Sequence, residues 1–337
     1  MRELQGTGEG MAEANHPIDK VRALQRALYV AAKEQRQRRF HALYDRIARP
    51  DVLRRAWEQV RRNKGAAGID GETLQAIEAY GVEKMLTELQ ALLVVGKYRP
   101  QAVRRVYIPK PGRPKERRPL GIPRVRDRVV QTATRLVIEP IFEASFLPCS
   151  FGFRPKRRAH DALELIRKEV NAGARWVVDA DFADFFGSLD PVLLLRLVAR
   201  RVSDRRVLRL IRMWLSAGVM EDGVSVGSMT GVPQGGTISP LLSNIYGHAL
   251  DALLGEGGKP PRQDRSLRGR EVRRKSVAVP VSHHRDWPSG DLVSQTSRSD
   301  PLVTGSLERP WRSVCSSGGA VVLVDQSVEA LPTQHRS

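Results

Sequence analysis

The stretch Trp176-Val-Val-Asp-Ala-Asp-Phe-Ala-Asp-Phe-Phe-Gly-Ser-Leu-Asp190 decides the fold that we expect. It begins with apolar residues, which predict a buried strand, and continues with Asp179 and Asp181 at alternate positions. Because residues two apart share one face of a strand, both carboxylates can leave the strand end in the same direction. An aromatic pair follows, and a helix is expected from Pro191 onward.

Two interpretations of these acids stay open. An acid at a strand end, followed by a pair such as Phe185 and Phe186, is how a polymerase palm presents its first metal ligand. The carboxylate then holds Mg²⁺, and the aromatic ring packs under the incoming sugar. In many other α/β proteins an acid at this place only caps the next helix. The surrounding sequence has to decide between the two interpretations.

The charge of the chain favours a polyanionic partner. The 337 residues contain 56 Lys and Arg against 37 Asp and Glu, which gives a net charge of +19 and a pI near 10.7. Nucleic acid is the simplest partner of such a protein, and a solubilising surface is the alternative.

The cysteines and the apolar runs exclude several classes of protein. Cys149 and Cys315 are too few and too far apart for a disulfide framework or a zinc site. Residues 1–10 lack the apolar core of a secretion signal, and the apolar run at 91–95 is too short to cross a bilayer. We therefore expect an intracellular, cytoplasmic protein without a membrane partner.

Periodic apolar residues predict a helix-rich first half. The expected helices are 19–47, 51–62, 72–95, 126–143, 159–170, 191–199 and 204–217. A strand is expected at 103–108, and turns are expected at 61–71, 151–158 and 223–227.

Two segments have the composition of ligand-binding loops. Residues 109–123 are basic and rich in Pro and Gly, so we expect neither a helix nor a central strand, and Lys110 and Arg118 would present cations to a triphosphate. A disordered basic linker is the alternative. Residues 231–246 read as a glycine turn that leads into a helix, with Gln234 able to touch a nucleotide. The alternative is an ordinary helix start.

Four sequence blocks resemble the reverse transcriptases and maturases that bacterial group II introns encode. They are Arg61–Gly71, Val106–Lys110 with Arg118–Pro123, Ser150–Pro155 with His160–Leu163, and Asp179–Asp190 with Gly231–Tyr246. The resemblance covers about residues 19–251. It implies an α+β right-hand polymerase fold, with fingers, a partial palm and a helix-rich N-terminus. It also implies RNA-directed DNA synthesis and an RNA-binding role in splicing and retrohoming. The same resemblance implies a bacterial protein that is associated with the nucleoid when it is bound to DNA.

The resemblance assigns roles to single residues. Asp181 matches the catalytic aspartate that binds Mg²⁺, and the backbone of Phe182 matches a second ligand of that metal. Asp179 is kept as a structural residue. The positions that would contact the nucleotide are Lys110, Arg118, Phe185, Phe186, Gln234 and Gly235. The candidates for RNA contact are Arg36, Arg38, Arg39, Arg61, Arg62 and Lys64. The implied partners are the intron RNA, an RNA template with a DNA primer and deoxynucleoside triphosphates, and the resemblance allows a homodimer.

The family pattern is expected to stop after the helix that contains Tyr246. The family continues with a Tyr-Ala-Asp-Asp hairpin, but no two Asp residues are adjacent in this sequence. Residues 255–337 are rich in Ser and Pro, and we expect a truncation or frameshift and a disordered tail. Without the hairpin, the strand at 177–181 would have an unpaired edge. One strand-like piece, 320–324, ends in Asp325, and a replacement catalytic hairpin there is the less favoured interpretation.

These expectations divide the chain into four parts. Residues 1–18 are expected to be disordered, 19–100 to form an N-terminal helical RNA-binding part, 101–254 to form fingers and partial palm, and 255–337 to form a tail. We expect that DNA synthesis is lost, because two-metal phosphoryl transfer needs more than one carboxylate. The alternatives are an RNA-binding remnant that acts only in splicing, and a non-functional product.

Overall fold

The computed structural model describes most of the chain up to residue 255 and two short strands beyond it. The described residues are 17–110, 113–172, 176–181, 185–221, 224–226, 235–255, 311–317 and 320–325. The helices are α1 (Pro17–Glu34), α2 (Tyr44–Ile47), α3 (Pro50–Arg62), α4 (Leu74–Tyr80), α5 (Val82–Val94), α6 (Val125–Glu143), α7 (Ala159–Asn171), α8 (Phe185–Ser188), α9 (Pro191–Ala199), α10 (Arg205–Leu215) and α11 (Ser239–Gly255). The strands are β1 (Val103–Lys110), β2 (Arg113–Ile122), β3 (Trp176–Asp181), β4 (Val219–Glu221), β5 (Val224–Val226), β6 (Trp311–Ser317) and β7 (Ala320–Asp325).

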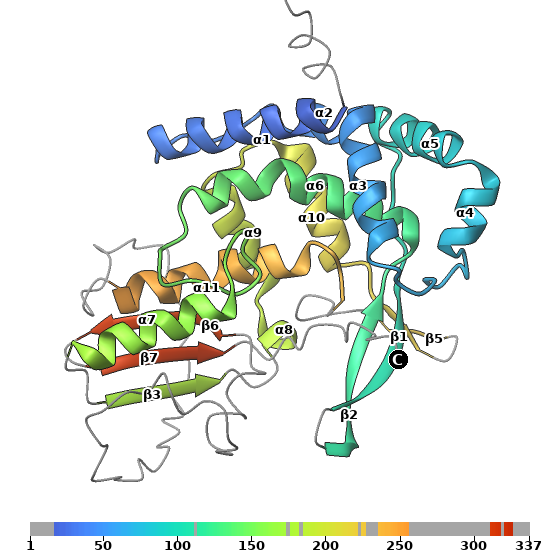
Figure 1. The fold of residues 1–337 in the computed structure, drawn as a ribbon. Coiled ribbons are helices and arrows are strands. Elements are labelled where there is room, and N and C mark those ends of the chain that lie inside the picture. Colours follow the sequence, from blue (N-terminus) through green and yellow to red (C-terminus); the bar gives the residue numbers. More distant parts are fainter. Residues whose placement is uncertain are drawn as a thin grey trace, which may run out of the picture.

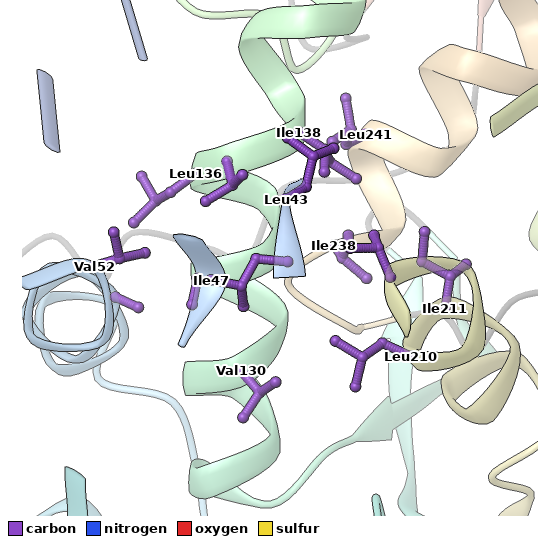
Figure 2. Packing of buried hydrophobic residues seen from close by; sticks show 14 of the residues in the cluster. Leu43, Ile47, Val52, Val130, Leu136, Ile138, Leu210, Ile211, Ile238 and Leu241 are labelled. Atoms are coloured by element: carbon purple, nitrogen blue, oxygen red, sulfur yellow. The ribbon is translucent and has the colours of Figure 1, made fainter. Parts of the chain in front are cut away.

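Helix α6 lies at the centre of the fold, as Figure 1 shows. It contacts α1, α2, α3 and α11, and fifteen of its nineteen residues are buried, including polar residues such as Asp127 and Gln131. Leu43 and Ile47 from the α2 segment, and Ile238 and Leu241 from the start of α11, belong to the same buried cluster as Val130 and Ile138 of α6 (Figure 2). Burial on all sides explains why α6 carries little of the one-sided apolar pattern of a surface helix.

The strands form two separate sheets. The first has the order β2-β1-β4-β5, and its long β1–β2 hairpin projects from the helices (Figure 1). The second has the order β3-β7-β6, in which β3 and β7 are parallel while β7 and β6 are antiparallel. Helix α7 contacts both β6 and β7, and α11 contacts β6.

One carboxylate joins the N-terminal helices to the middle of the chain. Asp204 is the N-cap residue of α10, where its Oδ1 accepts a hydrogen bond from the N–H of Arg206 at 3.0 Å. Its Oδ2 accepts hydrogen bonds from the N–H groups of Leu43 and Tyr44, at 3.0 and 2.8 Å, where α2 begins. These hydrogen bonds compensate the burial of the Asp204 carboxylate, because it accepts from free N–H groups at the starts of two helices.

Several predicted helices are confirmed, and the first is corrected. Helices α3, α6, α7, α9 and α10 begin and end within two residues of the predicted limits. The prediction of one helix over 19–47 is wrong, because α1 ends at Glu34 and α2 begins at Tyr44. Residues 33–39 are all polar and leave no apolar face to bury. The backbone of Phe40 pairs instead with the segment around Val202.

Three further predictions are corrected. Residues 72–95 form two helices, because Gly81 lies between them with a φ of +104°, which glycine adopts readily. The loop expected at 109–123 is mostly strand β2, an edge strand in which proline is tolerated. The turn expected at 223–227 contains the short strand β5.

The expectation that β3 lacks a partner strand is corrected, although β3 remains an edge strand among the described strands of its sheet. The strand predicted at 320–324 is present as β7, which pairs with β3 along all six of its residues. The tail expected to be disordered over 255–337 therefore contributes the two strands β6 and β7. None of the helices that the structure describes is long and apolar enough to cross a membrane.

Candidate nucleic-acid interface

The strand that carries the predicted metal ligand ends next to a second acid. Asp181 is the last residue of β3, and its register partner in the parallel strand β7 is Asp325. Only the backbone of these two residues is described. Phe182, whose backbone is predicted to bind the same metal, lies outside the described residues, as does Gln234.

The β1–β2 hairpin holds the two predicted triphosphate ligands. Lys110 ends β1, where the register shifts between Pro109 and Lys110, and its side chain is outside the described part of the chain. Arg118 is half-buried in β2 opposite Ile108. The hydroxyl of Tyr107 donates a hydrogen bond to Glu221 Oε1 at 2.6 Å, which ties the hairpin to β4.

The predicted aromatic pair lies in the core. Phe185 and Phe186 begin the short helix α8 and are only 6% and 5% exposed. Their rings meet edge to face with centroids 5.7 Å apart, and Phe185 also meets Tyr246 of α11 at 6.5 Å. In this arrangement neither ring is open to a ligand.

The glycine turn before α11 lies against the end of β2. Gly235 is exposed and has a φ of +115°, and a Cβ atom there would be 2.3 Å from the carbonyl oxygen of Gly121. No side chain fits at such a distance, so glycine is required for this contact. The turn that would face a nucleotide and the hairpin that would hold its phosphates are thus in direct contact.

The six predicted RNA-contacting residues are exposed and form two groups. Arg36, Arg38 and Arg39 lie between α1 and Phe40, and the Arg38 guanidinium lies 5.1 Å from the centroid of the Phe40 ring. The second group, Arg61, Arg62 and Lys64, lies at the end of α3.

The second group borders a hollow in the surface. Arg61 forms an ion pair with Glu78 at 2.6 Å, so part of its charge is already neutralised. Arg61 and Lys64 line a hollow of about 520 Å³ together with Gly65, Thr73 and Gln75.

The loop of residues 65–71 is held down by arginines of neighbouring elements. Arg104 of β1 donates to the carbonyl oxygen of Ala67 at 2.8 Å, and Arg128 of α6 donates to that of Ala66 at 2.7 Å. Burial lowers the pKa of the Arg128 guanidinium, and Asp70 opposes this change. The two bonds fix the loop next to the hollow described above.

A buried network fixes the start of α6. Asp127 accepts hydrogen bonds from the Tyr98 hydroxyl at 2.7 Å and from Arg124 Nε at 3.0 Å, and Trp214 Nε1 donates to the Tyr98 oxygen at 3.2 Å. Burial, and then the neighbouring Asp127 charge, raise the pKa of Tyr98 well above its ordinary value. The phenol therefore stays protonated and joins α6 to α10.

Three interior residues were not identified as important from the sequence. Arg154 lies in the turn expected at 151–158, where it is buried and bonded to Glu143 and to the carbonyls of Leu147 and Ser150. Asn244 Nδ2 donates to the Gly152 carbonyl at 2.8 Å, and Gln131 Oε1 accepts from the N–H of Thr237 at 2.9 Å. Nothing in the sequence indicated these hydrogen bonds, except that each of the three residues falls within or beside a predicted helix or motif.

Comparisons with known proteins point to one family. The family described as "Reverse transcriptase (RNA-dependent DNA polymerase)" matches residues 108–257. "Group II intron-encoded protein LtrA" of Lactococcus lactis subsp. cremoris is 39% identical over 217 residues, which are 64% of this chain and 35% of that protein. "Protein YkfC" of Escherichia coli (strain K12) is 37% identical over 296 residues, which cover 84% of this chain and 75% of that protein. "Nuclear intron maturase 2, mitochondrial" of Arabidopsis thaliana is 34% identical over 102 residues, or 30% of this chain and 14% of that protein.

The extent of these matches differs. The chain spans about a third of the length of LtrA but three quarters of YkfC. The match to YkfC must run past residue 251, since residues 1–251 make up less than 84% of the chain.

Proposed function

The chain belongs to the family of reverse transcriptases and maturases that group II introns encode, and from this premise we propose that it provides the fingers and part of the palm of an RNA-directed DNA polymerase. One observation carries the proposal. The β1–β2 hairpin and the turn at Gly235 belong to different sequence blocks, yet they meet so closely that a Cβ atom at Gly235 would clash with Gly121. The blocks for the triphosphate and for the base thus border one site.

In this proposal each block has its own task. Lys110 and Arg118 on the hairpin bind the triphosphate, because their charges oppose those of the phosphates. Gln234 and Gly235 face the nucleotide and template, where a glycine lets the backbone approach closely. Phe185 and Phe186 pack in the core at the start of α8, where Phe185 meets Tyr246 of α11.

Asp181 fits a ligand of Mg²⁺, since carboxylate oxygen is the donor that this ion prefers. When bound, the metal would neutralise charge on the transferred phosphate. The Phe182 backbone oxygen is the second proposed ligand. Among the residues that the structure describes, no cluster of three or more His, Cys, Asp or Glu could hold an ion. The side chains of Asp181 and Asp325 are not among those that the structure describes.

We propose that this polypeptide alone does not extend a primer but does bind structured RNA such as the intron. The first part follows from the absence of two adjacent Asp residues anywhere in the sequence. The proposed RNA binding follows from the exposed basic groups at Arg36–Arg39 and Arg61–Lys64. These groups lie beside α1 and α3, and not on the strand β3 that carries Asp181. RNA template, DNA primer and deoxynucleoside triphosphates are the partners of the intact enzyme, and a homodimer is compatible with this proposal.

A primer-extension assay with an RNA template, Mg²⁺ and deoxynucleotides tests the proposal. It compares the chain with an Asp181→Ala variant and with a version that carries a restored Tyr-Ala-Asp-Asp hairpin. We expect extension only by the restored version, and loss of that extension when Asp181→Ala is added. Extension by the unrestored chain that disappears in Asp181→Ala would contradict the proposed inactivity. A restored version that binds no primer–template would contradict the polymerase assignment itself.

A further inference from the structure

Gln131 of α6 holds the turn that precedes α11. Its side chain is only 5% exposed, and its Oε1 accepts a hydrogen bond from the N–H of Thr237 at 2.9 Å. The Thr237 hydroxyl donates to the carbonyl oxygen of Arg128 at 3.3 Å and accepts from the Thr132 hydroxyl at 3.2 Å. One turn of α6 thus binds both the backbone and the side chain of Thr237.

The same turn has no space to shift. A Cβ atom at Gly236 would lie 3.1 Å from Gln131 Oε1 and 2.8 Å from the Ser239 hydroxyl oxygen. On the other side, a Cβ atom at Gly235 would lie 2.3 Å from the Gly121 carbonyl oxygen of β2. The turn is therefore confined between α6 and the end of the hairpin, and Gln131 is the side chain that bonds its backbone on the α6 side.

We propose that Gln131 is a positioning residue for nucleotide binding. By fixing the backbone at Thr237, it sets the place of Gly235 relative to the β1–β2 hairpin, and so the distance between the base-facing and phosphate-facing parts of the site. Gln131 does not touch the nucleotide. This inference rests on the proposed function, because Gln131 supports residues of the same proposed nucleotide site.

A purely structural role makes a different prediction. Loss of a buried hydrogen bond anywhere in α6 destabilises the fold, but only loss of the bond to Thr237 should release the turn. Thr134 offers the matched comparison. It is fully buried in the same helix, and its hydroxyl donates to the carbonyl oxygen of Val130 at 2.9 Å without contacting the turn.

The experiment uses the full chain and three variants. Gln131→Met keeps the length of the side chain but removes the acceptor, Gln131→Glu keeps an acceptor oxygen, and Thr134→Val removes a buried hydroxyl elsewhere in α6. Binding of dTTP is measured by equilibrium titration in the presence of poly(rA)–oligo(dT) and Mg²⁺. Hydrogen–deuterium exchange of the peptide that covers residues 235–242 reports the turn without nucleotide. Urea unfolding reports overall stability.

We expect Gln131→Met to raise the dissociation constant of dTTP by about tenfold, since loss of the hydrogen bond to the partly buried Thr237 N–H lets the turn move. The turn should then exchange faster, while Gln131→Glu and Thr134→Val stay within about threefold of the parent for dTTP. Equal losses in Gln131→Met and Thr134→Val, or unchanged exchange in Gln131→Met, would overturn the inference. Absence of dTTP binding by the unmutated chain would instead overturn the proposed nucleotide site, and the inference with it.

Discussion

Two arginine–glutamate pairs of the same geometry lie in opposite surroundings. Arg154 pairs with Glu143 in the interior, with Nη2–Oε1 and Nε–Oε2 distances of 2.6 and 3.0 Å. Arg167 pairs with Glu164 on the outside of α7, at 2.7 and 2.8 Å between the same atoms. The Arg154 side chain is 4% exposed, whereas that of Arg167 is 47% exposed.

The difference shows that the positive charge of this chain has two uses. Interior arginines replace water as the partners of carbonyl and carboxylate groups, as Arg154 does for Leu147, Ser150 and Glu143. Exposed arginines remain available to a polyanion or contribute little. The net charge of +19 therefore cannot be read as nineteen units of RNA-binding surface.

The sharpest test of this comparison removes one arginine from each pair. Arg154→Met should lower the free energy of unfolding by about 3–5 kcal/mol, because it leaves Glu143 and the Ser150 carbonyl without this charged partner. Arg167→Met should leave the unfolding midpoint at its parent value, since water replaces the lost partner. Urea denaturation of both variants measures the difference. Similar losses in the two variants would show that burial does not separate the pairs.

The second prediction concerns the exposed group between α1 and Phe40. A triple change to Gln at Arg36, Arg38 and Arg39 should weaken binding of structured RNA by about ten- to a hundredfold at low salt. The slope of log K against log[salt] should become shallower by about 0.7–0.9 for each lost phosphate contact. Filter binding across a salt series measures both quantities, and the unfolding midpoint should not change.

The control for this triple variant changes the same net charge at exposed cations that already pair with acids. It combines substitutions to Gln at Arg54, Arg167 and Lys168. Its RNA affinity should fall clearly less than that of the first triple variant. An equal fall would mean that total charge, and not the position of the basic group, governs binding.

The smallest expected effect is a pH-dependent change in stability that differs between Glu139 and Glu164. Burial, opposed by Arg135 and reinforced by Glu143, raises the pKa of the Glu139 carboxyl. Because the pKa of Glu139 is higher in the folded than in the unfolded protein, its contribution to the free energy of unfolding is complete below the unfolded-state pKa, near 4.5. This contribution is lost as the pH rises through the folded-state pKa. Glu139→Gln should therefore be more stable than the parent at neutral pH, with a gain that vanishes toward pH 4.

The pKa of the exposed Glu164 is shifted in the opposite direction. Its hydrogen bond to Arg167 lowers the pKa of this carboxyl, so Glu164→Gln should show no gain at neutral pH. Urea midpoints at several pH values compare the two variants. A pH-independent gain in Glu139→Gln would mean that the effect does not come from titration of the carboxyl.

Sequence reasoning was most successful where a pattern is local. The apolar periodicity of α10 and the alternation of β1 depend only on neighbouring residues, and both were predicted. The end of α1 at Glu34 was missed because Phe40 finds its backbone partners beyond residue 200. Pairing of β3 with β7 was missed for the same reason, since strand partners distant in sequence leave no local signal.

In the candidate site, too, local motifs identified some residues, whereas contacts between distant segments were missed. The motifs identified Arg118, Gly235 and Asp181, and the structure brings the ends of the hairpin and the turn together. The motifs did not identify Gln131 or Arg154, because a buried polar side chain looks in sequence like one on the surface. Phe185 and Phe186 were placed in the right segment, but their burial follows from packing against α11, which the motif does not encode.

The shared cap at Asp204 also sets an order of events during synthesis. Leu43 and Asp204 are 161 residues apart in the chain. A ribosome that adds about 5–20 residues per second needs roughly 8–32 s to cover that interval. Throughout this time the start of α2 has no carboxylate to accept its N–H groups, and Phe40 has no partner strand. The segment from Phe40 to Tyr44, which is made early, is thus among the last parts of the fold to obtain its hydrogen bonds.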